Sequence, residues 1–247
     1  MSEPTRPGQR IRDFDYELPP AAIAQTPLDE RDASRLLVLE RRTGRVEHRV
    51  FRDLPDLLSP GDLLVVNRSR VFPARLLGRR KRGEAAEALL VRRVGAATWE
   101  ALVRPGRRLR PGHEIIVSPE LTLRIESEAL GHDGRRRVRL LAPDPDAAIT
   151  RLGHTPLPPY IRRADAPIDQ ERYQTVYARD EGSVAAPTAG LHFTTALLER
   201  LEQRGLGKAE VVLHVGPGTF RPVTVDDVSE HRVEPEPFTL PQRPPPP

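Results

Sequence analysis

The hydrophobic pattern of residues 15–66 predicts one short helix, one hairpin and one further strand. Residues 15–26, DYELPPAAIAQT, are typical of a short helix with a proline in its first turn, where the missing N–H breaks no hydrogen bond. The continuous apolar runs predict buried strands, and alternation predicts the returning strand of the hairpin. These elements are a strand at 36–39, a turn at 43–44, a strand at 46–50, a helical turn at 53–58 and a strand at 62–66.

Residues 73–153 have a different pattern. Short apolar runs such as ARLLG, ALLVRRV and HEIIVSP are separated by turn residues about every 8 to 12 positions, and helical periodicity is absent. This spacing is typical of an all-β barrel or sandwich. A helix, AAITRLG, follows and is expected to end at Gly153.

Residues 183–215 predict a strand–loop–helix–strand unit. Residues 183–186 form a narrow strand that Pro187 ends, and Gly190 allows a positive φ in the loop. Thr194 or Thr195 caps a helix, TALLERLEQR, whose leucines form a buried stripe before Gly205. The apolar run 209–215 is typical of a central parallel strand.

We therefore predict an α/β domain with an inserted all-β barrel domain. The α/β domain is expected to comprise residues 1–72 and 154–247, and the barrel residues 73–153. A chain of 247 residues is long enough for two domains of this size. Its hydrophobic content of 38% and charged content of 30% are globular values.

Charge is distributed unevenly. The chain has a net charge of +4, but residues 73–153 carry 17 Arg or Lys and 10 Asp or Glu, a net +7, which leaves −3 for the remainder. Such asymmetry is expected where a polyanion binds. An arginine-rich genome composition is the alternative explanation, and the charge pattern alone does not separate the two.

Several classes of chemistry are excluded. The chain has no cysteine, so disulfides, thiolate nucleophiles and Cys-ligated zinc are impossible. The seven histidines show no HxxxH or HxH spacing, so no metal is expected. GxGxxG and Walker A motifs are absent. The start, MSEPTRPGQR, lacks the apolar core of a signal peptide, and no apolar run approaches the roughly 18 residues that span a bilayer, so we expect a cytoplasmic protein.

Two glycine-bearing loops form the candidate site. The crossover is expected to bring the loop containing Thr188, Gly190 and His192 beside the loop 216–220, GPGTF, at the carboxyl ends of neighbouring strands. Free backbone amides and a helix N-terminus there would favour carboxylate or phosphate oxygens, and bulky side chains would hold the ligand away. The alternative is that Pro-Thr-Ala-Gly is only a tight connection.

Four polar side chains are candidates for the chemistry at this edge. His192 is suited to be a general base or a hydrogen-bond donor, or else it bonds backbone at a helix start. His214 lies inside an apolar strand and is either a core residue or a second base. Asn67 and Arg70 follow another strand and either reach the same edge or form a capped turn with a solvated arginine.

The segments DFDYELPPAAIAQTPLDERDASRLLVL, GDLLVVNRSRVFPARLLG, PLPPYIRR, YQTVYARDEGSVAAPTAGLHFT and LHVGPGTFRPV occur in this order between about Asp13 and Val223. Together they resemble the S-adenosylmethionine:tRNA ribosyltransferase-isomerase family of queuosine biosynthesis. The resemblance implies an α/β fold with an inserted β-barrel. It also implies transfer of the ribosyl group of S-adenosylmethionine to 7-aminomethyl-7-deazaguanine at the tRNA wobble position. The sugar is rearranged to give epoxyqueuosine, and adenine and methionine are released.

The resemblance also implies roles for residues. S-adenosylmethionine is a consumed substrate, and no true cofactor is expected. His192 is the first choice for the base that removes a C5′ hydrogen and His214 the second. The S-adenosylmethionine pocket is expected to be lined by Thr188, Gly190, Gly216, Gly218 and Thr219. Asn67 and Arg70 are expected to contact the base or the tRNA.

A noncatalytic tRNA-binding fragment and an inactive remnant are the alternative functions. Both the enzyme and the noncatalytic fragment would bind tRNA through its phosphates. The basic residues expected to contact these phosphates are Arg79, Arg80, Lys81, Arg82, Arg107, Arg108, Arg110, Arg135, Arg136 and Arg137. The family pattern His-x-Met-His-x-Glu is replaced here by HRVEPE, residues 231–236. The α/β domain is expected to be incomplete at its C-terminal side, and the protein to be a monomer.

Overall fold

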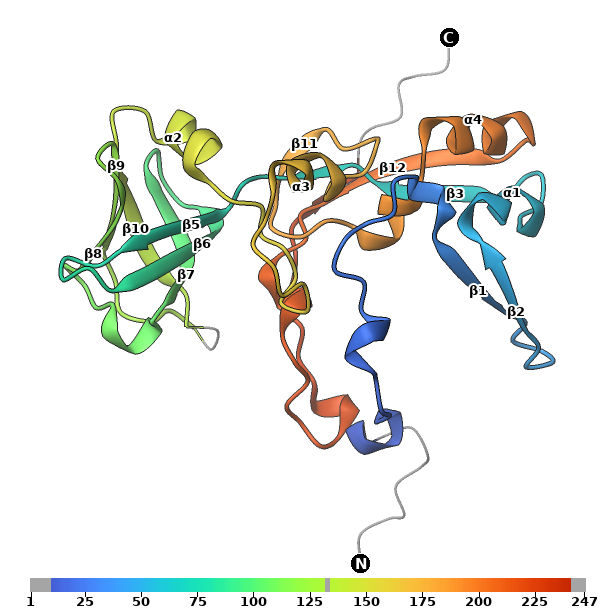
Figure 1. The fold of residues 1–247 in the computed structure, drawn as a ribbon, viewed down its shortest axis with the longest axis horizontal. Coiled ribbons are helices and arrows are strands. Elements are labelled where there is room, and N and C mark those ends of the chain that lie inside the picture. Colours follow the sequence, from blue (N-terminus) through green and yellow to red (C-terminus); the bar gives the residue numbers. More distant parts are fainter. Residues whose placement is uncertain (1–9, 132–133, 241–247) are drawn as a thin grey trace, which may run out of the picture.

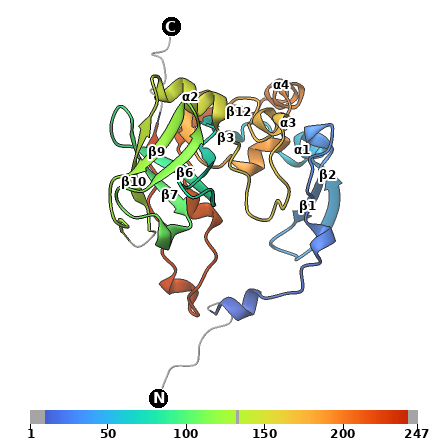
Figure 2. The same cartoon turned by 60° about the vertical axis from the view of Figure 1, so that its left-hand side comes forward.

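The computed structural model describes residues 10–131 and 134–240. Figure 1 shows an elongated molecule with a barrel at one end and two small sheets, a hairpin and short helices at the other. The N-terminal segment and the loop around residues 217–231 both extend away from the sheets on the same side. They meet where the Ile11 amide donates to the Asp226 carbonyl at 3.0 Å. Figure 2 shows the same meeting point from a second direction.

Six antiparallel strands form a closed barrel in the order β10-β7-β6-β5-β8-β9. The strands are β5 (Arg75–Arg79), β6 (Ala85–Arg93), β7 (Thr98–Arg104), β8 (Glu114–Ser118), β9 (Leu121–Ile125) and β10 (Arg136–Leu141). Buried and exposed side chains alternate along β9 and β10, as the pleat of a strand requires when one face lines a core. The barrel predicted from turn spacing is therefore confirmed.

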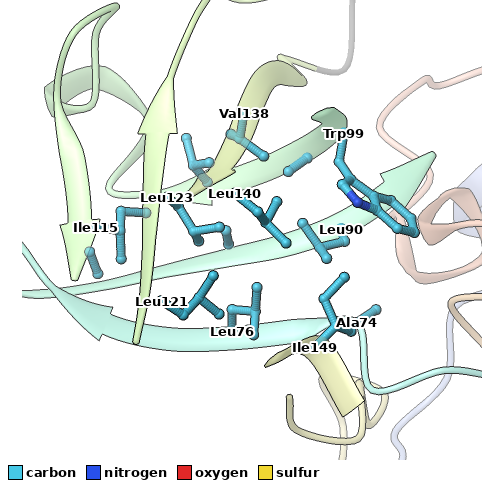
Figure 3. Close-up of a cluster of buried hydrophobic side chains, with 14 of the residues drawn as sticks. Ala74, Leu76, Leu90, Trp99, Ile115, Leu121, Leu123, Val138, Leu140 and Ile149 are labelled. Atoms are coloured by element: carbon cyan, nitrogen blue, oxygen red, sulfur yellow. The ribbon is translucent and has the colours of Figure 1, made fainter. Parts of the chain in front are cut away.

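Large aliphatic side chains fill the barrel. Figure 3 shows Leu76, Leu90, Leu123 and Val138 pointing toward one another, and none of the four is exposed to solvent. Helix α2 (Pro145–Leu152) closes one end with Ala148 and Ile149, and the Asp144 carboxylate caps its first turn.

The other part of the molecule is a small α/β assembly. Strand β12 is central in a three-stranded sheet, parallel to β3 and antiparallel to β13, while β11 pairs in parallel with β4, and β1 and β2 form the predicted hairpin. The strands are β1 (Arg35–Leu39), β2 (Val46–Val50), β3 (Leu63–Asn67), β4 (Ser69–Val71), β11 (Asp180–Ser183), β12 (Gly207–Leu213) and β13 (Phe238–Thr239). The predicted fold class, an α/β domain with an inserted all-β barrel, is confirmed.

A second core lies between the sheet and its helices. Val66 of β3 packs with Leu197 and Leu201 of α4 (Thr195–Gln203), and Phe51 and Phe193 join them. Thr194 caps α4 by accepting a hydrogen bond from the Leu197 amide, as predicted. The other α-helices are α1 (Leu54–Leu57) and α3 (Pro167–Arg172). The 3-10 helices are η1 (Ile11–Phe14), η2 (Pro20–Ala22), η3 (Arg31–Ala33), η4 (Phe51–Asp53), η5 (Gly106–Arg108), η6 (Thr188–His192), η7 (Pro217–Phe220) and η8 (Val228–Glu230).

Three sequence expectations are wrong. Residues 15–26 form only the single 3-10 turn η2, because prolines at 19 and 20 leave too few amides for an α-helix. The strands at 36–39 and 62–66 are not buried on both faces: Leu37 is 60% exposed and Leu63 is 61% exposed. Each strand packs one face on the second core and leaves the other open. The narrow strand of 183–186 ends at Ser183 instead of beginning there.

In the part of the chain that the structure describes, no helix combines the length and apolar character needed to cross a membrane. Over the same ranges, 10–131 and 134–240, no three His, Asp or Glu side chains gather as metal ligands do.

The two faces of β5 give a test of the barrel core. Leu76 is fully buried, whereas its neighbour Leu77 is 37% exposed. We expect Leu76→Ala to lower the free energy of unfolding by about 2–5 kcal/mol, because it leaves a cavity in the barrel. Leu77→Ala is the matched control and should cost less than about 1 kcal/mol. Urea denaturation followed by circular dichroism measures both, and equal losses would contradict the assignment of the two faces.

Candidate functional site

The carboxyl ends of β11 and β12 meet the start of β4 at a buried hydrogen-bonded junction. The Ser183 hydroxyl donates to the Ser69 hydroxyl at 2.7 Å and accepts from the Val215 amide at 3.0 Å. The amides of Val184 and Ala185 both donate to the Val215 carbonyl, at 2.8 and 3.2 Å. Each of residues 183–186 is at most 4% exposed. Small side chains are required here because the backbone packs closely against the neighbouring segment around Val215.

Gly190 lies in η6 and is small for a similar reason. A Cβ at this position would lie 2.3 Å from the Tyr177 hydroxyl and 2.8 Å from Cγ2 of Thr175, and φ at Gly190 is not positive. The positive φ that Gly190 would allow is therefore not used, and packing against Tyr177 and Thr175 already accounts for its missing side chain. Burial raises the pKa of Tyr177 to about 12, so its hydroxyl stays protonated at neutral pH.

His192 ends η6 and is half-buried. Its ring packs against Phe51, with ring centroids 5.2 Å apart and a tilt of 42°. Thr188, at the other end of η6, is exposed. The aromatic contact limits how the imidazole can turn, which suits a side chain that must hold a defined direction.

Two arginines link the N-terminal segment to α3, and one of them, Arg31, also links it to the η6 loop. The Arg31 guanidinium donates to the carbonyls of Glu171, Gln174 and Leu191 at 3.0, 2.8 and 3.1 Å. Arg172 donates in return to the carbonyls of residues 28 and 29 at 2.6 and 2.7 Å. Burial, together with repulsion from Arg172, holds the pKa of Arg31 below its ordinary value. Arg31 was not predicted as a site residue, although it lies in the quoted segment PLDERDASR.

His214 follows β12 and faces a glycine of β11. Its Nδ1 is buried and has no hydrogen-bond partner among the described residues. A Cβ on Gly182, where φ is +140°, would lie 2.7 Å from that nitrogen. Gly182 is thus required both by its backbone conformation and by the His214 ring, and sequence spacing gave no sign of this pair.

The second loop carries η7 and already has a carboxylate on its first amide. The Gly216 amide donates to Oε1 of Glu236 at 2.7 Å. Gly218 has open space at its Cβ position, and Thr219 is exposed. The Gly216 amide is thus already occupied, and Gly218 and Thr219 are the more open positions of this loop.

The polar residues after β3 divide into structural and exposed groups. The Asn67 carboxamide donates to the Leu213 carbonyl at 2.8 Å and accepts from the Leu213 amide at 3.0 Å. Arg68 bonds Asp180 at 2.7 Å and Glu210 at 3.2 Å, so it links β11 to β12. The Arg70 side chain is 46% exposed and lies 3.9 Å from Glu181.

The structure brings the starts of the two loops together at the junction, where residues 183–185 run beside Val215. Beyond that point their contacts diverge. The loop 187–192 packs on Phe51 and Tyr177, whereas the loop 216–220 faces Glu236. No hydrogen bond joins the two loops within residues 10–131 and 134–240.

The predicted RNA-contacting residues of the barrel also divide. Arg136 is a correction: its side chain is only 9% exposed, pairs with Glu128 and donates to the Gly106 carbonyl at 2.9 Å, so it braces the barrel. Arg135 pairs with Glu100 and with Glu234 of the C-terminal segment. Arg79 donates to the Gly83 carbonyl and Arg80 lies 3.7 Å from Glu84. The exposed members, which pair with no acidic side chain in the described ranges, are Lys81, Arg82, Arg107, Arg108, Arg110 and Arg137.

Asn67 and Arg70 give a test of this division. We expect Asn67→Ala to lower the free energy of unfolding by about 1–3 kcal/mol, because the backbone groups of Leu213 lose their partners. Arg70→Gln should change it by less than about 0.5 kcal/mol, because the side chain is exposed and loosely paired. Chemical denaturation of both variants measures the difference, and a neutral Asn67→Ala would contradict the structural role of the carboxamide.

Residues 11–244 match the family model described as queuosine biosynthesis protein. Curated S-adenosylmethionine:tRNA ribosyltransferase-isomerases from Thermotoga maritima and Heliobacterium modesticaldum are 51% and 54% identical over 94% and 92% of this chain, and over 68% and 66% of their own lengths. A crystal structure of S-adenosylmethionine tRNA ribosyltransferase from Thermotoga maritima shares 40% identity over 82% of this chain and 58% of that one, with a TM-score of 0.33. The chain thus spans about two thirds of the length of these curated relatives. On the family match and these identities, the chain belongs to the queuosine biosynthesis protein family.

Proposed function

We propose that this chain acts on tRNA as an S-adenosylmethionine-dependent ribosyltransferase-isomerase. The reaction moves the ribosyl group of S-adenosylmethionine to 7-aminomethyl-7-deazaguanine at the wobble position and isomerises it to give epoxyqueuosine, with release of adenine and methionine. The observation that carries the proposal is the match of residues 11–244 to the family, together with relatives of that name at about half identity. S-adenosylmethionine is consumed as a substrate, and no true cofactor takes part.

The chemistry needs a base near the sugar of S-adenosylmethionine. The sulfonium acidifies the C5′ hydrogens, so a placed base can remove one of them and leave an ylide, and departure of adenine then opens the ring. His192 is our first choice for this base because it is half-buried and its ring is held by Phe51. His214 is the second, because its Nδ1 is buried without a partner among the described residues.

We assign the substrate contacts to residues of the two loops. The surroundings of each residue indicate whether it contacts the substrate or shapes its loop. Gly218, Thr219 and Thr188 have exposed or open positions suited to contact a polar ligand. Gly190 and Gly216 act by shaping their loops, because one faces Tyr177 and the other holds Glu236. Asn67 holds the end of β12 through the backbone of Leu213, and the exposed side chain of Arg70, which is only loosely paired with Glu181, can contact the tRNA.

The His192 assignment can be tested on the reaction itself. We expect His192→Gln to slow adenine release by about 10²- to 10⁴-fold, the usual contribution of a placed acid or base. His48→Gln, an exposed histidine on β2, is the matched control and should leave the rate unchanged. The purified chain is incubated with S-adenosylmethionine and tRNA carrying the aminomethyl precursor, and adenine and the modified nucleoside are measured by mass spectrometry.

Three outcomes of this assay have distinct meanings. Unchanged adenine release by His192→Gln contradicts its role as the base, and the same assay on His214→Gln then tests the second choice. Wild-type chain that binds tRNA but releases no adenine supports the alternative of a noncatalytic tRNA-binding protein. Wild-type chain that does neither contradicts both functions.

The exposed barrel arginines can be tested separately from catalysis. We expect Arg107→Gln and Arg110→Gln each to reduce the slope of log K against log salt for tRNA by about 0.7–0.9, the contribution of one phosphate contact. Arg136→Gln should instead lower the free energy of unfolding by about 2 kcal/mol, because a charged hydrogen bond to the Gly106 carbonyl is lost, and leave the salt slope unchanged. Fluorescence anisotropy at several salt concentrations distinguishes arginines that contact RNA from the arginine that stabilises the barrel. A reduced slope for Arg136→Gln alone would contradict both assignments.

A further inference from the structure

A cavity of about 380 Å³ lies where the N-terminal segment meets the chain that leaves the barrel. It is separate from the two glycine loops and belongs to the segments 15–26 and PLPPYIRR, to which the proposed function assigns no role. The residues that line it are Pro20, Ile23, Gln25, Tyr160, Arg162 and Arg163. Its volume is within the range of small-ligand sites in proteins.

The walls of this cavity are held by long-range hydrogen bonds. The Gln25 carboxamide accepts from the Arg162 amide at 2.7 Å and donates to the Tyr160 carbonyl at 3.1 Å. Arg163 donates from Nε to the Gln25 carbonyl at 2.8 Å. One glutamine thus ties together backbone segments more than 130 residues apart, and the cavity is formed before any ligand arrives.

The charges of the two arginines differ in availability. The Arg163 guanidinium makes two bonds to the Asp169 carboxylate, at 2.6 and 2.7 Å, and that side chain is only 4% exposed. The hydrogen bond from Arg163 holds the pKa of Asp169 below its ordinary value, so the pair is charged and mutually neutralised at neutral pH. Arg162 is exposed and forms no ion pair with any residue that the structure describes, so the cavity has one available positive charge.

The remaining walls supply a flat aromatic surface and an apolar contact. Tyr160 is 49% exposed, and Pro20 and Ile23 line the same cavity. An aromatic face beside an available guanidinium is the combination that binds an unpaired nucleotide, because the base stacks and the phosphate pairs with the arginine. A donor whose reaction must be shielded from water would need a more enclosed place.

We propose that this cavity holds one unpaired nucleotide of an RNA strand, with its base on Tyr160 and its phosphate at Arg162. The choice of RNA rests on the proposed function. The cavity acts as an anchoring contact that positions the strand on the α/β part of the molecule, away from the exposed arginines of the barrel.

Binding of fluorescently labelled tRNA to the full chain tests the proposal by anisotropy at several salt concentrations. We expect Tyr160→Ala to weaken binding about tenfold, and Tyr160→Phe, which keeps the ring, to stay within about twofold of wild type. Arg162→Gln should reduce the salt slope by about 0.7–0.9. Arg41→Gln, an exposed arginine in the β1–β2 turn, is the matched control and should have little effect.

Several results would overturn this assignment. Wild-type affinity and salt slope in both Tyr160→Ala and Arg162→Gln would do so, as would absence of tRNA binding by the wild-type chain. If Tyr160→Ala and Arg162→Gln lost S-adenosylmethionine binding in equilibrium dialysis but kept tRNA binding, the cavity would be assigned to S-adenosylmethionine. That result would overturn the RNA proposal. Thermal unfolding checks that Tyr160→Ala is folded; if it is not, the salt slope of Arg162→Gln decides the proposal by itself.

The adenine assay separates this proposal from the proposed function. Normal adenine release by the wild-type chain, with tRNA binding unaffected in both the Tyr160→Ala and the Arg162→Gln variants, would refute the role of the cavity and leave the proposed function standing. Tyr160-dependent tRNA binding by a wild-type chain that releases no adenine would refute the catalytic function and support the cavity.

Discussion

The requirement that buried backbone groups find hydrogen-bond partners governs the α/β part of this molecule. Its strands are short and belong to separate small sheets, so regular ladders satisfy only some of their amides and carbonyls. Side chains complete the pairing where the strands end: Asn67 serves both groups of Leu213, and Ser183 serves the Val215 amide. This junction positions the residues of both loops, because each loop begins within a few residues of it.

The loops are positioned by contacts from opposite ends of the chain. The N-terminal segment holds the η6 loop through Arg31 and Phe51, and the C-terminal segment holds the η7 loop through Glu236. Close packing explains the small residue Gly190 in the η6 loop, whereas Gly218 in the η7 loop has open space beside it. The two loops are therefore held in place independently of each other.

Basic charge on the barrel has two separate uses. Arg136 donates a hydrogen bond to the Gly106 carbonyl inside the protein, and Arg135 links the barrel to the C-terminal segment through Glu234. Arg107 and Arg108, both in η5, are exposed and form no ion pair in the described ranges. Their charge is therefore available to a polyanion, whereas a count of arginines along residues 73–153 would treat all of them alike.

Elements with local signals could be predicted from the amino-acid pattern alone. Turn spacing predicted the barrel, and Thr194 and Gly205 predicted the limits of α4, because a periodic pattern and a cap act within a few residues. Partners that are distant along the chain were decided only by the tertiary structure: Tyr177 explains Gly190, Gly106 and Glu128 explain Arg136, and Gln25 shapes the Tyr160 cavity. The same residue type can pack, brace or face solvent, and the choice among these depends on which remote side chain fills the space beside it.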